Sequence, residues 1–339
     1  MRASYASLGR AHKRLGYKIG YPAKLDRLQY TTDLNATVAN GIAELTAKEF
    51  GLSSGICDDV SPAKGDLGRA RESIRHYVRD WSTEGAKERE KIFGPIIDLL
   101  KTVDPPKRQN TSVLVPGCGL GRLAWEISEL GFNTTGNELS YFMILAFRFL
   151  VSPATTTTVN EHTIHPYAHW FSHQRSNDAL FRPVHFPDVV PRTSEKFKLV
   201  EGDFLKLSLP PSVSSVNNAA IWQKQEFDKA SSEAVGYDFI VTLFFIDTSL
   251  NVLTTMEHIY YLLKPGGAWV NFGPLLWTGG AQTKLELSLE GIFAAAHEIG
   301  FIDDPSIETR TIECEYTADI LAMMRWIYKA EFWVMRRPT

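Results

Sequence analysis

Three glycines at alternate positions, Gly117, Gly119 and Gly121, are the first residues of this chain whose spacing suggests chemistry. They follow the apolar run 112–116 and precede a segment with helical periodicity, which predicts a strand, a tight turn and a helix. Glycines in such a turn let a ligand approach the backbone closely because no Cβ intervenes. Glu138 follows about 20 positions later, at the end of a second predicted strand, where a carboxylate can bind the hydroxyls of a nucleotide ribose.

This pattern favours an adenosyl ligand over two alternatives. The spacing Gly-x-Gly-x-Gly differs from the Gly-x-Gly-x-x-Gly of dinucleotide-binding turns, so a nicotinamide cofactor is the weaker interpretation, and a turn without a ligand is the other. Asp203 and Phe204 follow another predicted strand, 197–200. Such a pair can accept from an adenine amino group and pack on the ring, or it can be a turn aspartate beside a core phenylalanine.

A further carboxylate, Asp247, directly follows the near-continuous apolar run 237–246. Such a run predicts a strand buried on both faces of a parallel sheet. At the end of that strand, Asp247 could orient an N–H group of a substrate or accept its proton. The alternative is that Asp247, Thr248 and Ser249 only cap the next predicted helix, 250–263.

The elements that position these residues predict an α/β protein with a helical N-terminal region. Periodic apolar residues indicate a helix that begins at Asp33, a second that contains Ile74 and Trp81, and a third around 92–100. We expect residues 1–105 to form a helical cap and residues 106–339 a sheet domain, with insertions near 152–196 and 209–235. The other expected elements are helices 122–130 and 140–150, strands 133–138, 268–272 and 330–335, and a sharp turn at 264–267.

Composition limits the class of protein. A formal net charge of −3 gives no basic surface for nucleic acid, and the apolar runs are too short to span a bilayer. Three cysteines, odd in number and far apart, predict neither a disulfide framework nor a zinc site, which fits a cytoplasmic protein. The basic segment 1–24 is either an ordinary solvated segment or a targeting segment. We leave a homodimer open.

Histidines are concentrated in the first insertion. His165, His169 and His173 would share one face if this segment were helical, and could then bind a metal. Pro166 interrupts them, and no carboxylate or cysteine accompanies them at ligand spacing, so polar packing of an ordered insertion is the preferred interpretation and we expect no metal.

The order of these features resembles class I S-adenosylmethionine-dependent methyltransferases, which have a Rossmann-like core. Longer motifs narrow the resemblance to the carnosine N-methyltransferase family, and the resemblance runs in register from about residue 65 to the C-terminus. These motifs are Val-Arg-Asp-Trp-Ser (78–82), Val-Pro-Gly-Cys-Gly-Leu-Gly-Arg-Leu-Ala-Trp-Glu-Ile (115–127), Gly-Asn-Glu-Leu-Ser-Tyr-Phe-Met (136–143), Arg-Pro-Val-His-Phe-Pro-Asp-Val (182–189), Phe-Phe-Ile-Asp-Thr (244–248) and Asn-Phe-Gly-Pro-Leu-Leu (271–276).

The resemblance implies S-adenosylmethionine as cofactor and assigns two sets of site residues. The cofactor set is His76, Arg79, Gly117, Cys118, Gly119, Glu138, Asp203, Phe204, Leu243 and Phe244. The substrate set is Asp247, Trp277, Thr278, Tyr316, Trp326 and Tyr328, of which Asp247 and Tyr328 are the expected catalytic residues. Arg79 matches the family arginine that binds the cofactor carboxylate.

The sequence departs from the family pattern where the substrate is expected. Thr278 stands in place of a histidine that contacts the carnosine ring, Leu250-Asn251 in place of His-Asn, and His76 in place of a glutamine. We therefore predict S-adenosylmethionine-dependent N-methylation of a small nitrogen nucleophile, with poor turnover of carnosine itself. The candidates are a histidine-containing dipeptide and an amide or amine of a peptide-derived metabolite. The alternative from another class is a non-catalytic module that binds the cofactor.

Overall fold

The computed structural model describes residues 1–51, 65–209 and 236–339 of the chain, which forms two compact units. The first unit comprises Met1–Ala86, Arg148–Val190 and Thr317–Trp326. The second comprises Lys87–Phe147, Pro191–Tyr316 and Ile327–Thr339. The predicted boundary after residue 105 stays a prediction, and the predicted insertion at 209–235 lies, apart from its first residue, outside the described residues.

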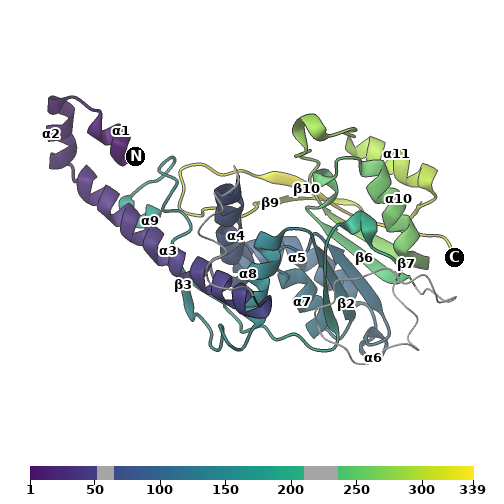
Figure 1. Ribbon diagram of the computed structural model, residues 1–339. Coiled ribbons are helices and arrows are strands. Elements are labelled where there is room, and N and C mark those ends of the chain that lie inside the picture. The colour runs from purple at the N-terminus through teal and green to yellow at the C-terminus, as the bar shows by residue number, and fades with distance from the viewer. Residues whose placement is uncertain (52–64, 210–235) are drawn as a thin grey trace. The chain divides into compact units, whose positions relative to one another are not determined.

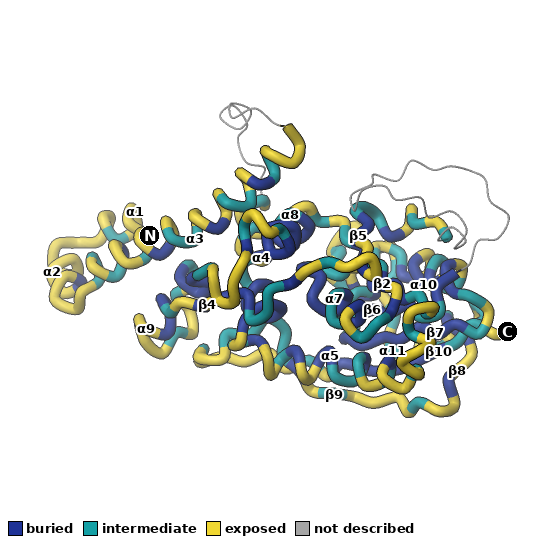
Figure 2. The backbone as a smooth tube through the Cα atoms, turned by 90° about the horizontal axis from the view of Figure 1, so that it is seen from below, coloured by how far each residue is buried: buried dark blue, intermediate teal, exposed yellow. Residues whose placement is uncertain are grey.

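The first unit is mainly helical (Figure 1). Its regular elements are α1 (Arg2–Ala6), α2 (Arg10–Lys18), α3 (Tyr21–Glu49), α4 (Asp66–Trp81), β3 (His162–Ile164), α9 (Asn177–Leu180) and β4 (Val184–Phe186). Strands β3 and β4 form a separate two-stranded antiparallel sheet. Helices α1 and α2 are largely exposed, as Figure 2 shows, and Gly16 is their one buried residue.

The second unit is built on a mixed eight-stranded sheet. Its strands are β1 (Ser112–Pro116), β2 (Asn133–Glu138), β5 (Phe197–Glu201), β6 (Tyr237–Leu243), β7 (Leu263–Gly273), β8 (Ile302–Asp303), β9 (Arg310–Cys314) and β10 (Tyr328–Arg336). Its α-helices are α5 (Ala86–Lys101), α6 (Pro105–Arg108), α7 (Arg122–Glu129), α8 (Tyr141–Val151), α10 (Val252–Leu262) and α11 (Leu289–Ile299), of which α5 and α8 cross a unit boundary. Its described residues also form the short 3-10 helices η1 (Phe204–Lys206), η3 (Ile246–Thr248) and η4 (Gly280–Gln282).

Strand order explains why this unit can hold a ligand. The order is β5-β2-β1-β6-β7-β10-β8, in which β5, β2, β1, β6 and β7 pair in parallel and β10 runs antiparallel to β7, with β9 also paired to β10. Chain order reverses between β1 and β6. In open parallel sheets this switch point leaves a crevice at the carboxyl ends of the strands. The predicted α/β core with Rossmann-like topology is therefore confirmed.

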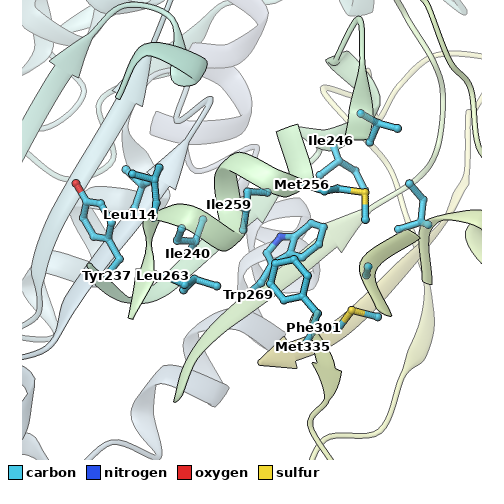
Figure 3. Packing of buried hydrophobic residues seen from close by; sticks show 14 of the residues in the cluster. Leu114, Tyr237, Ile240, Ile246, Met256, Ile259, Leu263, Trp269, Phe301 and Met335 are labelled. Atoms are coloured by element: carbon cyan, nitrogen blue, oxygen red, sulfur yellow. The ribbon is translucent and has the colours of Figure 1, made fainter. Parts of the chain in front are cut away.

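One buried apolar cluster of the sheet unit lies between the central strands and helices α10 and α11. Figure 3 shows Trp269, Met256, Phe301 and Met335 within one cluster of buried side chains. The Trp269 indole N–H donates to Thr242 Oγ1 at 2.9 Å, so its polar atom is satisfied inside this core. The successive β6 residues Ile240, Val241 and Thr242 are all fully buried, which confirms the prediction of a central strand covered on both faces.

Most predicted elements are present, and their boundaries differ for identifiable reasons. The first predicted helix begins at Tyr21 after a left-handed Gly20, so Asp33 is not its N-cap but lies inside α3. Strand β6 ends at Leu243 because Phe244 takes a positive φ of 50°. The predicted turn at 264–267 is part of β7, where the strand pairing shifts register and Gly266 supplies a φ of 77°.

The histidine-rich insertion is ordered in residues 152–196 but is not helical at 165–173, so the shared helical face predicted as an alternative is wrong. Its histidines make local hydrogen bonds instead: His165 Nδ1 lies 2.9 Å from the Phe181 carbonyl oxygen and His162 Nε2 lies 3.0 Å from Thr156 Oγ1. Within the described part of the chain, no three His, Cys, Asp or Glu side chains are placed to hold a metal ion. No described helix combines the length and apolar character needed to cross a membrane.

Candidate active site

The predicted site residues of the second unit gather at the carboxyl ends of its five parallel strands. The glycine loop follows β1, Glu138 ends β2, and Asp203 follows β5. On the other side of β1, Asp247 follows β6, and the segment 274–278 follows β7. Because parallel strands place these ends along one edge, residues 130 positions apart in the chain become neighbours.

The glycine loop has the backbone geometry that the sequence predicts. Gly117, Gly119 and Gly121 all adopt positive φ, at 62°, 57° and 71°. A Cβ at Gly117 would lie 2.5 Å from the Phe245 ring, which follows β6, so this glycine is required for the loop to pack on that segment. A Cβ at Gly119 would meet no atom within 4 Å, and the loop is therefore open to a ligand at that point.

Glu138 joins the end of β2 to this loop. Its Oε2 accepts the Gly119 N–H at 2.8 Å, and its Oε1 accepts the N–H groups of Leu139 and Ser140 at 2.9 and 2.8 Å. Burial raises the pKa of the Glu138 carboxyl, and these three N–H groups oppose that rise by stabilising the carboxylate. The hydrogen bonds fix the orientation of the carboxylate, and Oε2, which accepts only one of them, has further acceptor capacity.

The next carboxylate along the edge, Asp203, caps the short helix η1. Its Oδ1 accepts the Leu205 N–H at 3.0 Å. Phe204 is buried and its ring lies edge-on to those of Phe245 and His258, with centroids 5.4 and 5.0 Å apart. These contacts are those of the turn-and-core interpretation, while contact of this pair with an adenine stays a prediction.

Phe244 connects the cofactor half of the edge to an aromatic cluster. It adopts a positive φ of 50°, which is costly for a residue with a Cβ and which clusters at functional sites. Its N–H donates to the Phe272 carbonyl at 2.9 Å, and a Cβ at the adjacent Gly273 would lie only 3.1 Å from its backbone. Its ring packs on Tyr316 and Tyr328, with centroids 4.6 and 5.6 Å away. The structure thus brings together two predicted substrate tyrosines.

Asp247 is a buried carboxylate, 5% exposed, in the short helix η3. Its Oδ2 accepts the Leu276 N–H at 3.0 Å, and its backbone carbonyl accepts the Thr278 N–H at 3.2 Å. The helix that follows, α10, begins after Asn251 without a side-chain cap, so the interpretation of Asp247 as a helix cap is wrong. Burial raises the pKa of Asp247 to about 6, against the opposing effect of its backbone hydrogen bonds.

Tyr328 shares the electrostatic environment of Asp247. Burial raises the pKa of the Tyr328 hydroxyl, and the negative charge of Asp247 raises it further. Trp277 donates its indole N–H to the Leu287 carbonyl at 3.2 Å and packs against the core, whereas Thr278 is exposed. The Asp247 carboxylate, the Tyr328 phenol and the rings of Phe244, Trp277 and Tyr316 therefore lie at the ends of four strands, β6, β7, β9 and β10.

The remaining predicted residues, His76, Arg79 and Trp326, belong to the first unit. Arg79 is buried and donates from Nε and Nη2 to the two oxygens of Asp80, at 2.6 and 3.0 Å. Burial, and then the charge of Arg79, lowers the pKa of His76, so its ring is neutral at neutral pH. Trp326 is 68% exposed. The parts of these three residues in binding stay predictions.

Sequence reasoning missed three positions that shape this edge. Phe245 packs against both the glycine loop and Phe204, Gly273 gives Phe244 its space, and Leu276 supplies the N–H that holds Asp247. Each lies within a quoted motif, but their roles depend on contacts between strands that are distant in sequence, so periodicity gave no signal for them.

Known proteins with similar sequences identify the family of this chain. A family model described as carnosine N-methyltransferase matches residues 57–339. The mouse carnosine N-methyltransferase is 33% identical over 330 residues, with 94% of this chain and 76% of that protein covered. That of Schizosaccharomyces pombe is 30% identical over 337 residues, with 92% and 82% covered. The chain belongs to the carnosine N-methyltransferase family.

As a member of this family, the protein is an S-adenosylmethionine-dependent N-methyltransferase with a Rossmann-like class I core. Among solved structures, magnesium protoporphyrin IX methyltransferase from Synechocystis with bound S-adenosylhomocysteine is 10% identical, covers 80% of this chain and 95% of that one, and gives a TM-score of 0.42. The family assignment rests on the sequence relatives.

The residues at the edge of the enzyme's sheet fit this cofactor. The open backbone at Gly119 leaves room for a ligand beside the loop, and the oriented Glu138 carboxylate has remaining capacity to accept hydroxyl groups. Three consecutive strand ends, those of β2, β1 and β6, thus provide an acceptor, a sterically open turn and an apolar surface. This is the combination that a charged adenosyl ligand requires.

We expect Glu138→Ala to weaken S-adenosylmethionine binding by roughly tenfold or more, because charge-assisted hydrogen bonds to the ribose are lost and the loop loses its acceptor. Isothermal titration calorimetry with S-adenosylhomocysteine measures this. Glu126→Ala is the matched control, because Glu126 accepts from Arg122 on the neighbouring helix α7 and should leave affinity unchanged. Unchanged affinity in a folded Glu138 variant would remove this residue from the site.

We expect Asp247→Asn to stabilise the fold at pH 7.5. Because the folded-state pKa of Asp247 is raised to about 6, the folded state binds its proton more tightly than the unfolded state. The wild type therefore loses stability as pH rises from about 4 to about 6, and the asparagine variant does not. Above pH 7 the free energy of unfolding of the variant should exceed that of the wild type by ~1–3 kcal/mol. Urea unfolding at pH 4.5 and 7.5 measures this.

Asp304→Asn provides a control of opposite sign for this measurement. Burial raises the pKa of Asp304, but hydrogen bonds from Ser306 and the Arg336 guanidinium outweigh burial and lower the pKa. Asp304→Asn should therefore destabilise the protein at pH 7.5, and the loss should shrink as pH falls through the low pKa of Asp304. A loss of stability in both variants at pH 7.5 would contradict the prediction, because it would mean that the hydrogen bonds of Asp247 outweigh the cost of burying its charge.

Proposed function

We propose that the enzyme methylates a ring or amine nitrogen of a small molecule, and that Asp247 orients the nucleophile and takes up its proton. The observation that supports this is the buried Asp247 carboxylate, held by Leu276 and lying in the electrostatic environment of Tyr328. A module that only binds cofactor has no need to bury a carboxylate beside an aromatic cluster.

S-adenosylmethionine, when bound, supplies an electrophilic methyl group on a sulfonium, and would leave as S-adenosylhomocysteine once the bond between sulfur and that methyl group is broken. The protein must align an unprotonated nitrogen with that methyl group and exclude water. For an imidazole, the nitrogen that bears the lone pair forms the new N–C bond, and the other ring nitrogen then gives up its proton. Asp247 can accept that proton, because its pKa of about 6 is close to the ~6.5 of imidazole.

Aromatic residues would hold the rest of the substrate. Tyr316 and Tyr328 flank the Phe244 ring, and Trp277 lies in the segment after β7. A flat nitrogen heterocycle packs well on such rings, and a phenol can hydrogen-bond a polar group of the substrate. We propose Tyr328 as the second catalytic residue and Trp277, Tyr316 and Trp326 as substrate contacts.

We propose ten residues as cofactor contacts. In the second unit, Gly117, Cys118 and Gly119 would lie along the methionyl end and Glu138 along the ribose. Asp203 and Phe204 would contact the adenine, and Leu243 and Phe244 would be further cofactor contacts. His76 and Arg79 would bind the methionyl carboxylate, and two hydrogen bonds to Asp80 fix the orientation of the Arg79 guanidinium. We also propose that the enzyme acts in the cytoplasm.

The substrate class that the relatives support is a histidine-containing dipeptide, since the mouse and fission-yeast relatives are named for carnosine. The residues that would meet the dipeptide nevertheless differ here. Leu250 is half-exposed and apolar, and exposed Thr278 presents a short hydroxyl where the family places an imidazole. Sites that lose a hydrogen-bonding group lose selectivity for the polar ligand it recognised. We therefore propose a less polar nitrogen nucleophile as the preferred substrate, with carnosine as the second candidate.

We expect the purified enzyme to show a lower kcat/KM for carnosine than for less polar imidazoles and amines of similar size, and Thr278→His to raise carnosine turnover about three- to tenfold by restoring one hydrogen bond. Mass spectrometry of the methylated product measures both. Thr278→Ala is the control and should give no gain. Efficient wild-type methylation of carnosine would overturn the substrate preference while leaving N-methylation intact.

A further inference from the structure

Arg182 begins the motif 182–189, which the methyl-transfer site does not use. We propose that Arg182 is a positioning residue that fixes the segment Thr317–Trp326 of the first unit, and through it the substrate-binding aromatic residues. The proposal rests on the proposed function, because that segment contains Trp326 and directly connects Tyr316 to Tyr328 in the chain.

The guanidinium of Arg182 bridges two carboxylates from distant parts of the sequence. Nη2 donates to Glu84 Oε1 at 2.6 Å and to Asp319 Oδ1 at 2.7 Å, and Nε donates to Glu84 Oε2 at 3.3 Å. Nη1 donates to the Ala179 carbonyl at 2.9 Å, so each nitrogen of the group has an acceptor. Paired, planar recognition of this kind is what arginine provides and lysine does not.

Tyr167 completes the network and shields it from water. Its hydroxyl donates to Glu84 Oε1 at 2.9 Å, and the Arg182 guanidinium lies over its ring, 3.9 Å from the centroid. The side chains of Arg182, Glu84 and Asp319 are only 13%, 18% and 9% exposed. At such burial an ion pair is weakly screened, and removing one partner leaves charge unpaired at high cost.

Removing the Arg182 charge would do more than delete one contact. Glu84 and Asp319 approach the same Nη2 atom within 2.7 Å and would then face each other as like charges. Asp319 would keep the hydrogen bonds that it accepts from the Gln174 amide at 2.9 Å and from the Leu321 N–H at 3.1 Å. Repulsion between the two carboxylates would push the segment away from Glu84.

The segment depends on such polar contacts because its apolar side chains are not buried. Ile320, Met323 and Trp326 are 60%, 62% and 68% exposed. Regular secondary structure within the segment is limited to one isolated bridge between Gln174 and Ala322. Further hydrogen bonds to the segment run from Arg75 Nη2 to the Thr317 carbonyl at 2.7 Å and from the Tyr167 hydroxyl to the Ala318 carbonyl at 3.4 Å, and the Met323 N–H donates to the His173 carbonyl at 2.6 Å.

Displacement of this segment should therefore change substrate binding and leave cofactor binding intact. Tyr316 precedes the segment, Trp326 is part of it, and Tyr328 follows it, whereas the glycine loop, Glu138 and Asp247 belong to other elements. A defect that raises KM for the nitrogen substrate without changing cofactor affinity distinguishes positioning from general loss of structure.

The test compares Arg182→Met, Arg182→Lys and Asp319→Asn with Arg27→Met in the full-length enzyme. Arg27 pairs with Asp178 in the same unit, but that pair is exposed, so its loss should have little effect. Three quantities are measured: amide hydrogen exchange of residues 317–326, KM for the nitrogen substrate, and the dissociation constant of S-adenosylhomocysteine.

We expect Arg182→Met to accelerate exchange across 317–326 and to raise KM about tenfold or more, with cofactor affinity changed less than about twofold. Arg182→Lys should give an intermediate effect, and Asp319→Asn should reproduce the accelerated exchange if Arg182→Met does not fold. Unchanged exchange, or accelerated exchange with unchanged KM, would overturn the proposal. Absence of methyl transfer in the wild type would instead contradict the proposed function, and the exchange data would still decide whether Arg182 holds the segment.

Discussion

The parallel pairing of five strands is the constraint on which the rest of this enzyme depends. Parallel strands β5, β2, β1, β6 and β7 end at the same edge, so the residue that follows each strand is forced into one row. Short hydrogen bonds then lock the row: the Gly119 N–H to Glu138, the Gly202 N–H to the Glu138 carbonyl, and the Leu276 N–H to Asp247. Residues that are spread over the sequence from 117 to 278 therefore lie along one edge of the sheet.

Charge placement separates the two halves of this edge. Glu138 is stabilised as a carboxylate by three N–H groups, which suits a fixed acceptor for hydroxyls. At Asp247 the effect of burial outweighs that of the backbone hydrogen bonds, so its pKa rises to about 6 and it can exchange a proton near neutral pH. In the first unit, the buried Arg182 guanidinium is paired with two carboxylates, and the role that we propose for it is to hold chain segments in place. The surroundings of these three charged groups thus differ, and each suits the role that we propose for the group.

Much of this could be predicted from the sequence, because the signals were local. The glycine loop, the acid that ends β2 and the apolar run of β6 each carry their own pattern over a few residues, and the family motifs fixed the rest of the order. The residues at which helices and strands begin and end were harder to predict. The alternative interpretation of Asp247 as a helix cap arose because this residue precedes a helical pattern, yet its side chain accepts a hydrogen bond from the Leu276 N–H, in the segment after β7. The Arg182 network could not be predicted from the sequence. Its members Glu84, Tyr167, Arg182 and Asp319 are far apart in the chain, and only the tertiary fold brings them together.

The most direct test of the central claim, that Asp247 takes up the proton of the nitrogen nucleophile, is the pH dependence of kcat for methyl transfer at saturating S-adenosylmethionine. Wild-type kcat should rise with pH and level off above an apparent pKa near 6, because Asp247 must be ionised to accept a proton. Asp247→Asn should bind S-adenosylhomocysteine normally, lose most of its activity, and lack that limb of the profile. Profiles of the same shape for the two enzymes would contradict the account.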